Sequence, residues 1–411
     1  MISIEMWRNL TQPDGQCSML NAPYHALDAF NVTDYLTNNV QELLPCTSWE
    51  FDMSLIGKTI VSEWNLVCDR LYLGSVVESC FLAGAGLGSV TSGWISDQHG
   101  RKNTLLAFAT VQLVAGYLLA FCNTVELFML LRVVIGFCSM AVVVVSFVLC
   151  VELVSGKWRT IIGILNIFPV AIAYILCAGI SYLTYNWRPM QFVIATPTLL
   201  LLCLWRFMPE SPRWLLARGR TEELAVIIEK ASIWNNRPLA INYKNTLNIP
   251  QSGIGRRVSV LDLFQKGYKR TTFLMTIVWF SIILIYFGIT LHMSSLGGNV
   301  YINTIIAGSV EACSIAFSVL VVLKLGLRVN LFIYLIIAAA ACVLINFARA
   351  DNLWLTIGLA MIIKITVGAC NALIPTYTAE RYPVYMRNLG IGAGNFAAGF
   401  ALVLVPYLFL L

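Results

Sequence analysis

The chain has 411 residues, of which 58% are hydrophobic and 12% are charged, and its formal net charge is +6 at pH 7. Soluble domains carry about 25% charged residues, so this chain has too few charges to cover the surface of a soluble protein. The composition excludes a cytosolic enzyme and predicts a polytopic membrane protein.

The first 70 residues are polar, with nine acidic and three basic side chains. They contain the only two Asn-x-Ser/Thr sequons of the chain, Asn9 and Asn31. Because such sites are glycosylated only outside the cytosol, we expect residues 1–70 to be extracellular and to carry glycans at both asparagines. The same segment has three cysteines, which is an odd number, so one of them lacks a partner.

Ten apolar stretches follow, and each is long enough for a helix of about 20 residues to cross the hydrocarbon. Five precede a polar insert at 209–270 and five follow it. The predicted spans are 71–94, 103–122, 125–150, 160–182, 189–208, 271–291, 300–323, 329–348, 354–378 and 388–410.

Basic residues are distributed unevenly over the short loops between these spans. With residues 1–70 outside, the inner loops hold eight Lys or Arg residues and the outer loops hold two. Cytoplasmic loops carry such an excess, so this bias and the sequons predict the same orientation. The insert has 11 basic and five acidic residues and lies inside, where the anionic leaflet accounts for its charge without any nucleic acid.

Two inner loops repeat one spacing of charges. Glu152 precedes Arg159 by seven residues, and Glu380 precedes Arg387 by seven residues in a loop 228 residues later. Two helical turns separate such residues, so both charges can lie on one face and pair across a helix junction. Coincidence is the alternative to a duplication. A duplicated half with an inner linker predicts two bundles that rock around a central site.

Several motifs give the chain a family resemblance. The sequence from Gly93 to Lys102 resembles the loop signature of the major facilitator superfamily, with Gln98 at a position that is usually basic. Pro209 to Leu215 and Thr376 to Gly390 are similar to signatures of its sugar and organic-ion branches. The segment from Cys46 to Cys68, with Trp279-Phe280 and Tyr286-Phe-Gly288, resembles the organic cation, anion and carnitine transporter family.

This resemblance implies an all-α membrane protein with the major facilitator fold, in which two pseudo-symmetric bundles are formed by about ten transmembrane helices. The expected divisions are an extracellular loop at 1–70, an N-terminal bundle at 71–208, a cytoplasmic linker with amphipathic helices at 209–270 and a C-terminal bundle at 271–411. The family has twelve helices, so the first and the twelfth are expected to be missing from this sequence.

Charges inside predicted spans are candidates for a functional site, because an ion in the membrane is costly and faces protein or water. They are Glu78, Arg132, Glu311 and Lys364. Glu78 with Arg132 can be a structural pair, and Glu311 with Lys364 can likewise pair with each other and never meet a substrate. Aromatic faces attract organic cations, although an aromatic stripe can also be mere packing. The expected substrate-binding residues are Trp279, Tyr286, Thr290, Glu311, Lys364 and Asn371.

The expected gating residues lie at the inner ends of the helices. In families with this resemblance, such contacts lock the carrier open to the outside. The gating residues are Asp97, Arg101, Glu152, Arg159, Glu380 and Arg387. In the linker, Ser211 is expected to cap a helix that starts at Pro212, and Thr221 to open an amphipathic helix that ends near Trp234.

The predicted function is secondary transport of small organic ions across the plasma membrane by alternating access. A cation or a zwitterion is favoured because Glu311 lies among aromatic residues, although Gly390 to Gly399 holds neither the acid of cation carriers nor the arginine of anion carriers. The alternatives are a non-transporting fragment of such a carrier and an organic anion carrier. No cofactor, metal, catalytic residue or nucleic-acid partner is expected, and the oligomeric state is left open.

Overall fold

The computed structural model describes residues 17–20, 43–53, 57–239, 263–265, 267–292, 299–347, 353–382 and 386–409 of the chain. The chain divides into two compact units. The first unit comprises Met1–Ser75 and Tyr185–Trp187, and the second comprises Val76–Thr184 and Arg188–Leu411.

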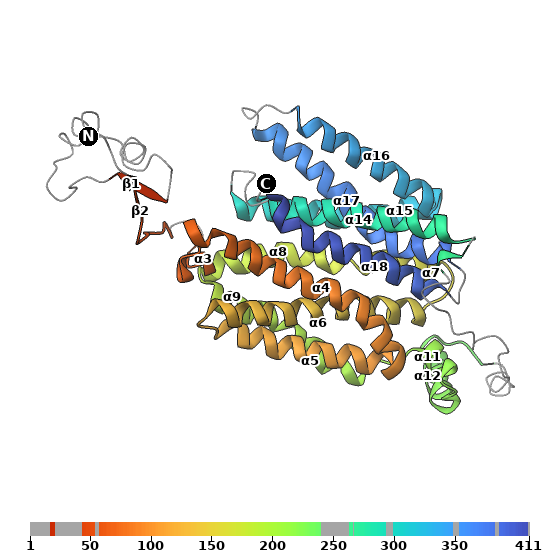
Figure 1. Ribbon diagram of the computed structural model, residues 1–411. Helices are drawn as coiled ribbons and strands as arrows, with labels where there is room; N and C mark the ends of the chain where they lie inside the picture. The colour runs from red at the N-terminus through yellow and green to blue at the C-terminus, as the bar shows by residue number, and fades with distance from the viewer. Residues whose placement is uncertain are drawn as a thin grey trace. The chain divides into compact units, whose positions relative to one another are not determined.

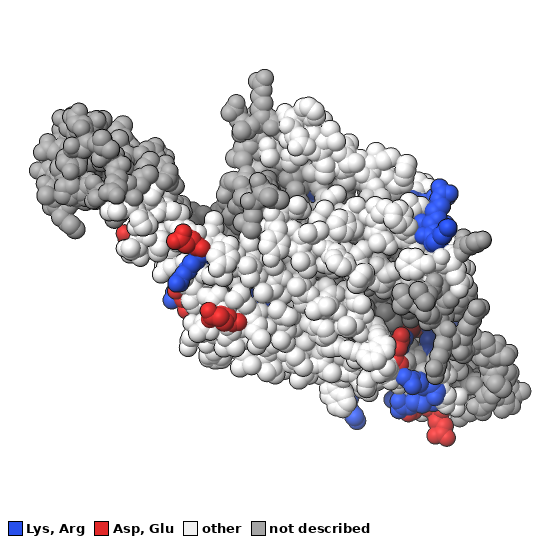
Figure 2. Space-filling model, viewed as in Figure 1, with Lys and Arg blue, Asp and Glu red and all other residues white. Residues whose placement is uncertain are grey.

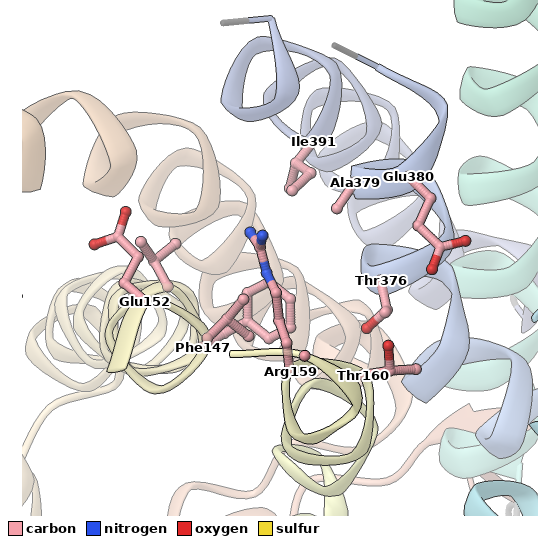
Figure 3. Close-up of a pocket in the computed structure, with 11 residues that line it drawn as sticks. Phe147, Glu152, Arg159, Thr160, Thr376, Ala379, Glu380 and Ile391 are labelled. Carbon is pink, nitrogen blue, oxygen red and sulfur yellow. The ribbon is translucent and has the colours of Figure 1, made fainter. Parts of the chain in front are cut away.

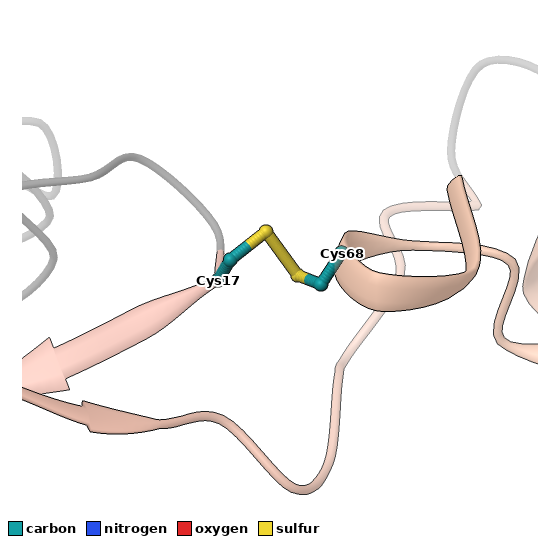
Figure 4. Close-up of a disulfide and its surroundings, with 2 residues drawn as sticks. All are labelled: Cys17 and Cys68. Atoms are coloured by element: carbon teal, nitrogen blue, oxygen red, sulfur yellow. A yellow bond between two sulfur atoms is a disulfide. The ribbon is translucent and has the colours of Figure 1, made fainter. Parts of the chain in front are cut away.

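The first unit contains a small antiparallel sheet and a disulfide. Strands β1 (Ser18–Leu20) and β2 (Leu43–Pro45) pair with each other, which no sequence pattern predicted. Cys17 is bonded to Cys68 (Figure 4), and Cys46 is a free thiol. The structure therefore assigns the unpaired member of the three cysteines to Cys46.

The same unit holds the turn Tyr185–Trp187 against the segment around helix α3 (Ile60–Trp64). The backbone amide of Lys58 donates to the Tyr185 carbonyl at 3.0 Å, and the Trp187 amide donates back to the Lys58 carbonyl at 3.1 Å. The indole Nε1 of Trp187 donates to a carboxylate oxygen of Glu63 at 2.7 Å. These contacts join two parts of the chain more than 100 residues apart into one unit.

The long helices follow one another in chain order (Figure 1). Before the linker they are α4 (Leu71–His99), α5 (Arg101–Ala120), α6 (Val125–Leu153), α7 (Lys157–Leu165), α8 (Phe168–Thr184), α9 (Trp187–Ala195) and α10 (Pro197–Cys203). After it they are α14 (Lys269–His292), α15 (Val300–Leu325), α16 (Leu327–Ile345), α17 (Leu353–Arg381) and α18 (Arg387–Leu404). Short 3-10 helices lie at Cys68–Arg70, Leu204–Arg206 and Val405–Phe409.

Ten helical segments among the described residues are long and apolar enough to cross a membrane, and each one overlaps a predicted span. Two spans differ in detail from a single helix. The span at 160–182 breaks between α7 and α8, and the span at 189–208 breaks between α9 and α10. Pro169 and Pro197 lie at the start of the second piece in each case, where a proline has no amide to bond the preceding turn.

The described part of the linker has the predicted helices. Helix α11 (Pro212–Ala217) is capped by Ser211, whose hydroxyl accepts the Trp214 amide. Helix α12 (Thr221–Trp234) begins and ends at the expected residues. Residues 240–262, which belong to the same linker, lie outside the described residues.

One turn conformation recurs in the two sets of spans. Gly100 links α4 to α5 with φ 93° and ψ 155°, and Gly326 links α15 to α16 with φ 79° and ψ 165°. This region of backbone space is essentially open only to glycine. The two glycines are offset in sequence by the same distance, within two residues, as the repeated Glu/Arg loops. We interpret the recurrence as a structural trace of the duplication.

The two sets of spans meet along closely packed helices inside the second unit. Helix α15 packs along α8, where a Cβ on Gly308 would lie 2.8 Å from the carbonyl oxygen of Ala171. Helix α4 meets α18 at Gly86 and Gly399, and a Cβ on Gly86 would lie 3.0 Å from the Gly399 Cα. Small residues at these crossings let the backbones touch, as is usual between membrane helices.

Charged side chains on the face shown in Figure 2 gather toward the two ends of the molecule, and the surface between them is almost free of charge. This is the distribution expected of helices that cross a hydrocarbon layer. We call the end at which α4 turns into α5 the inner end, because the basic residues of the sequence place it in the cytoplasm.

Candidate functional site

A buried ion pair lies between α15 and α17. The ammonium Nζ of Lys364 is 3.3 Å from Oε2 of Glu311, and the two side chains are 2% and 0% exposed. An isolated charge at such a position costs several kcal/mol, so both groups depend on the pairing. The alternative that these two charges pair with each other is therefore what the structure shows.

Tyrosine and threonine side chains surround this pair. The hydroxyl of Tyr286 donates to Oε1 of Glu311 at 2.9 Å, and Nζ of Lys364 donates to Oγ1 of Thr290 at 2.6 Å. The ammonium also lies 3.8 Å from the ring centre of Tyr286 and 4.7 Å from that of Tyr174. We call these five residues the ammonium cage.

The cage is assembled by four helices, because Tyr174 comes from α8 while the others come from α14, α15 and α17. Tyr286 and Thr290 are four residues apart and so lie on one face of α14. On α17, Gly368 follows Lys364 by one turn, and a Cβ there would lie 3.1 Å from Oε1 of Glu311. Glycine at this position lets the carboxylate lie against the helix.

Two predicted binding residues lie elsewhere on the same helices. The indole of Trp279 donates to the Thr378 hydroxyl at 3.0 Å and lies against Gly394, where a Cβ would be 2.6 Å from Nε1. Trp279 is two turns from Tyr286 and is only 4% exposed. Asn371 is partly buried, two turns beyond Lys364 on α17. The structure thus brings together four of the six predicted binding residues.

An acid beside aromatic rings can bind an ammonium ion. The rings present their negative faces to a cation, and each contact contributes about 0.5–2 kcal/mol. In this structure the cation in the cage is the side chain of Lys364 itself. Tyr174 was not identified from the sequence, because a single tyrosine in an apolar run carries no signal of its position relative to a helix that is far away in the chain.

A second polar cluster lies at the inner end, around Arg101. Its guanidinium contacts Oδ1 of Asp97 at 2.8 Å and Oε2 of Glu152 at 3.1 Å. It also donates to the backbone carbonyl of Ser96 at 3.2 Å. These contacts join α4, α5 and α6, and they bring together three of the six predicted gating residues.

Glu210 of the linker completes this cluster by capping α5. Its carboxylate accepts the backbone amides of Arg101 and Lys102 at 2.9 and 3.1 Å. Gly100 at the N-cap position has no side chain that could do so, and a Cβ there would lie 2.5 Å from a Glu210 oxygen. A carboxylate is favourable at a helix N-terminus. No local pattern reveals this cap, because it comes from more than 100 residues away.

The linker helix α11 is anchored to the same place. Ser211 donates its hydroxyl to Glu152, and the Trp214 indole donates to the Asp97 carbonyl at 2.9 Å. Arg218 donates to the carbonyls of Asp97 and Gln98. Trp214 is only 8% exposed, so the sequence-based expectation of an anchor at the membrane surface is wrong for this residue.

A cavity of about 270 Å³ opens beside this cluster, between α6 and α7 on one side and α17 and α18 on the other. Figure 3 shows the Arg159 side chain reaching into it from α7, with Glu152 on one side and Glu380 on the other. Thr160 and Thr376 turn their hydroxyls toward each other across it. We call this space the inner cavity.

The remaining predicted sites are placed as follows. Glu78 and Arg132 form an ion pair with an N–O distance of 3.1 Å, as the structural alternative proposed. The side chain of Arg387, at the start of α18, lies outside the described part of the structure, and so do Asn9 and Asn31. Among the described residues, no group of three or more His, Cys, Asp or Glu side chains could hold a metal ion.

Comparison with known proteins places the chain among transporters. The family model for the sugar (and other) transporter matches residues 20–346. The organic cation transporter protein of Drosophila melanogaster is 31% identical over 425 aligned positions, which cover all of this chain and 76% of the relative. Human organic cation/carnitine transporter 2 is 32% identical over 363 positions, which cover 87% of this chain but only 65% of the relative.

Solved structures share the arrangement of the helices. The proton:xylose symporter XylE bound to 6-bromo-6-deoxy-D-glucose has a TM-score of 0.65 at 20% identity, covering 85% of this chain and 81% of that protein. The human organic anion transporter MFSD10 has a TM-score of 0.57 at 14% identity, covering 85% and 80%. These similarities establish the major facilitator fold.

Proposed function

The chain belongs to the sugar (and other) transporter family of the major facilitator superfamily, and on this premise we propose that it moves small organic ions across the membrane by alternating access. The ion is a cation or a zwitterion. The curated relatives are named as transporters of organic cations and carnitine, which supports this choice of substrate.

The ammonium cage is the observation that carries the proposal. A fully buried Glu311 with a tyrosine hydroxyl and two tyrosine rings close to one cation is the environment that an organic ammonium group requires. Lys364 fills this environment from within. A substrate cation therefore competes with a tethered ammonium group for the same carboxylate and the same ring faces.

The pairing also accounts for movement of the empty carrier. While Lys364 neutralises Glu311, no unpaired charge has to pass through the hydrophobic stage of the transport cycle. When substrate arrives, a cation replaces the lysine at Glu311, and a zwitterion offers its carboxylate to the displaced Lys364 as well. A zwitterion thus leaves both protein charges paired.

Alternating access is supported by the contacts between the two sets of spans. They touch through small residues such as Gly86 and Gly308, so the helices can tilt without large side chains having to interlock. We assign the N-terminal bundle to 71–208 and the C-terminal bundle to 271–411, joined by the linker. Inner-end charges serve as the gate: Asp97, Arg101, Glu152, Arg159, Glu380 and Arg387.

Uptake measurements with charged probes test this function. Cells that express the chain are given radiolabelled tetraethylammonium, a trimethylammonium carboxylate or an aromatic carboxylate. We expect uptake of the first two probes, and we expect Glu311→Gln to reduce tetraethylammonium uptake by tenfold or more. Glu78→Gln is the matched control, because it removes a paired glutamate that lies outside the cage.

Three results would count against the proposal. Unchanged cation uptake in Glu311→Gln would remove the cage from the substrate path. Uptake of the aromatic carboxylate alone would identify an organic anion carrier instead. Absence of uptake for all three probes, with the protein at the cell surface, would favour a non-transporting member of the family.

A further inference from the structure

The inner cavity has a wall that is prepared for an anion. Arg159 extends its guanidinium into the space, and Thr160 and Thr376 contribute hydroxyls (Figure 3). Thr376 is only 8% exposed, and its Oγ1 has no hydrogen-bond partner within the described structure. A buried hydroxyl without a partner is unfavourable, so the hydroxyl is poised to bond an atom that enters the cavity.

A glycine keeps this hydroxyl accessible. Gly163 of α7 lies beside Thr376, and a Cβ at that position would be 2.7 Å from Oγ1. Any larger residue would cover the hydroxyl or displace the threonine. Thr378 on the same helix differs, because its hydroxyl is engaged with both the Ile374 carbonyl and the Trp279 indole.

The charges in the cavity are separated into a positive and a negative side. Glu152 is already paired with Arg101 and accepts the Ser211 hydroxyl, so its charge is compensated outside the cavity. Arg159 supplies a positive charge on α7, and Glu380 supplies a negative one on α17, one turn after Thr376. A ligand that complements this arrangement has an anionic group and a cationic group.

We propose that the inner cavity is a second substrate site, which binds the carboxylate of a zwitterionic organic ion through Arg159 and the two threonine hydroxyls. Its cationic end faces Glu380. The volume of about 270 Å³ is below the range of drug-sized pockets, so the ligand is small. This inference rests on the proposed transport function and names an additional station for its substrate at the inner end.

Transport from the inner side tests the site. Inside-out vesicles that contain the full chain are given γ-butyrobetaine, a trimethylammonium carboxylate, or its methyl ester, which keeps the cation and lacks the anion. The readout is the ratio of the two KM values. We expect Thr376→Val and Arg159→Gln each to raise the KM for the carboxylate relative to the ester by roughly tenfold, the loss of one hydrogen bond to a charged group.

Thr366→Val is the matched control. Thr366 lies on the same helix and is also buried, but its hydroxyl is already bonded to the backbone carbonyl of Ile362 at 2.8 Å. We expect this variant to keep the wild-type ratio. An unchanged ratio in both Thr376→Val and Arg159→Gln would overturn the proposed site, and so would an equal change in the control.

A binding measurement separates failure of this site from failure of transport. We expect γ-butyrobetaine to raise the Tm of the purified chain, its ester to raise it less, and Thr376→Val to remove the difference. This result stands even if no vesicle transports either probe, in which case the transport function alone is refuted. Equal stabilisation by acetate and γ-butyrobetaine would overturn the zwitterion assignment, because an anion alone would then account for binding.

Discussion

Removing one member of the Glu311–Lys364 pair is expected to destabilise the protein far more than removing both. Glu311→Gln keeps an oxygen that can accept the Tyr286 hydroxyl, but it leaves the Lys364 ammonium buried without a counter-charge. Lys364→Met leaves the carboxylate unpaired, and Oε2 of Glu311 has no hydrogen bond in the described structure to compensate. Breaking a buried pair costs about 3–5 kcal/mol.

The double variant removes both charges and so avoids that penalty. Neutral replacement of a buried pair is often close to neutral for stability, so Glu311→Gln with Lys364→Met should lie within about 1–2 kcal/mol of the wild type. The coupling between the two sites is then opposite in sign to the single effects and exceeds 3 kcal/mol or so.

Thermal unfolding of the detergent-purified protein, followed by size-exclusion chromatography, measures these differences. At about 2 °C of Tm per kcal/mol, each single variant should lose roughly 6–10 °C, and the double variant should recover most of it. Glu78→Gln is the control, since the Glu78 and Arg132 side chains are 40% and 22% exposed and such a pair contributes about 0–1 kcal/mol. Additive losses in the double variant would refute the reasoning.

Two further predictions concern packing and disulfide pairing. Gly86→Val places methyl groups against the backbone of α18 and should cost about 1–3 kcal/mol by overpacking, measured as a lower Tm, whereas Gly93→Val on the same helix has nothing within 4 Å of its Cβ and should leave the Tm nearly unchanged; equal losses would contradict the close helix crossing. On intact cells, an impermeant maleimide should label Cys46 without reduction and label Cys17 and Cys68 only after reduction, which mass spectrometry of the peptides reports; labelling of Cys17 without reduction would contradict the pairing.

The sequence determined the membrane-spanning helices and their order. Runs of about 20 apolar residues can be satisfied in lipid only as helices, because every backbone amide must find a partner within its own segment. The ten spans therefore follow from composition alone, and the caps of the linker helices follow from local residues such as Ser211 and Pro212. The breaks in two spans were also present in the sequence, as Pro169 and Pro197.

Contacts between distant segments were decided only by the tertiary structure. The sequence identified Glu311 and Lys364 as candidates, because a charge in an apolar run is conspicuous, but it left open whether they meet. It could not place Tyr174 beside them or Glu210 on the start of α5, since neutral residues and linker acids carry no record of their partners. Spacing along one helix fixes a face, whereas the packing of separate helices fixes which faces share a site.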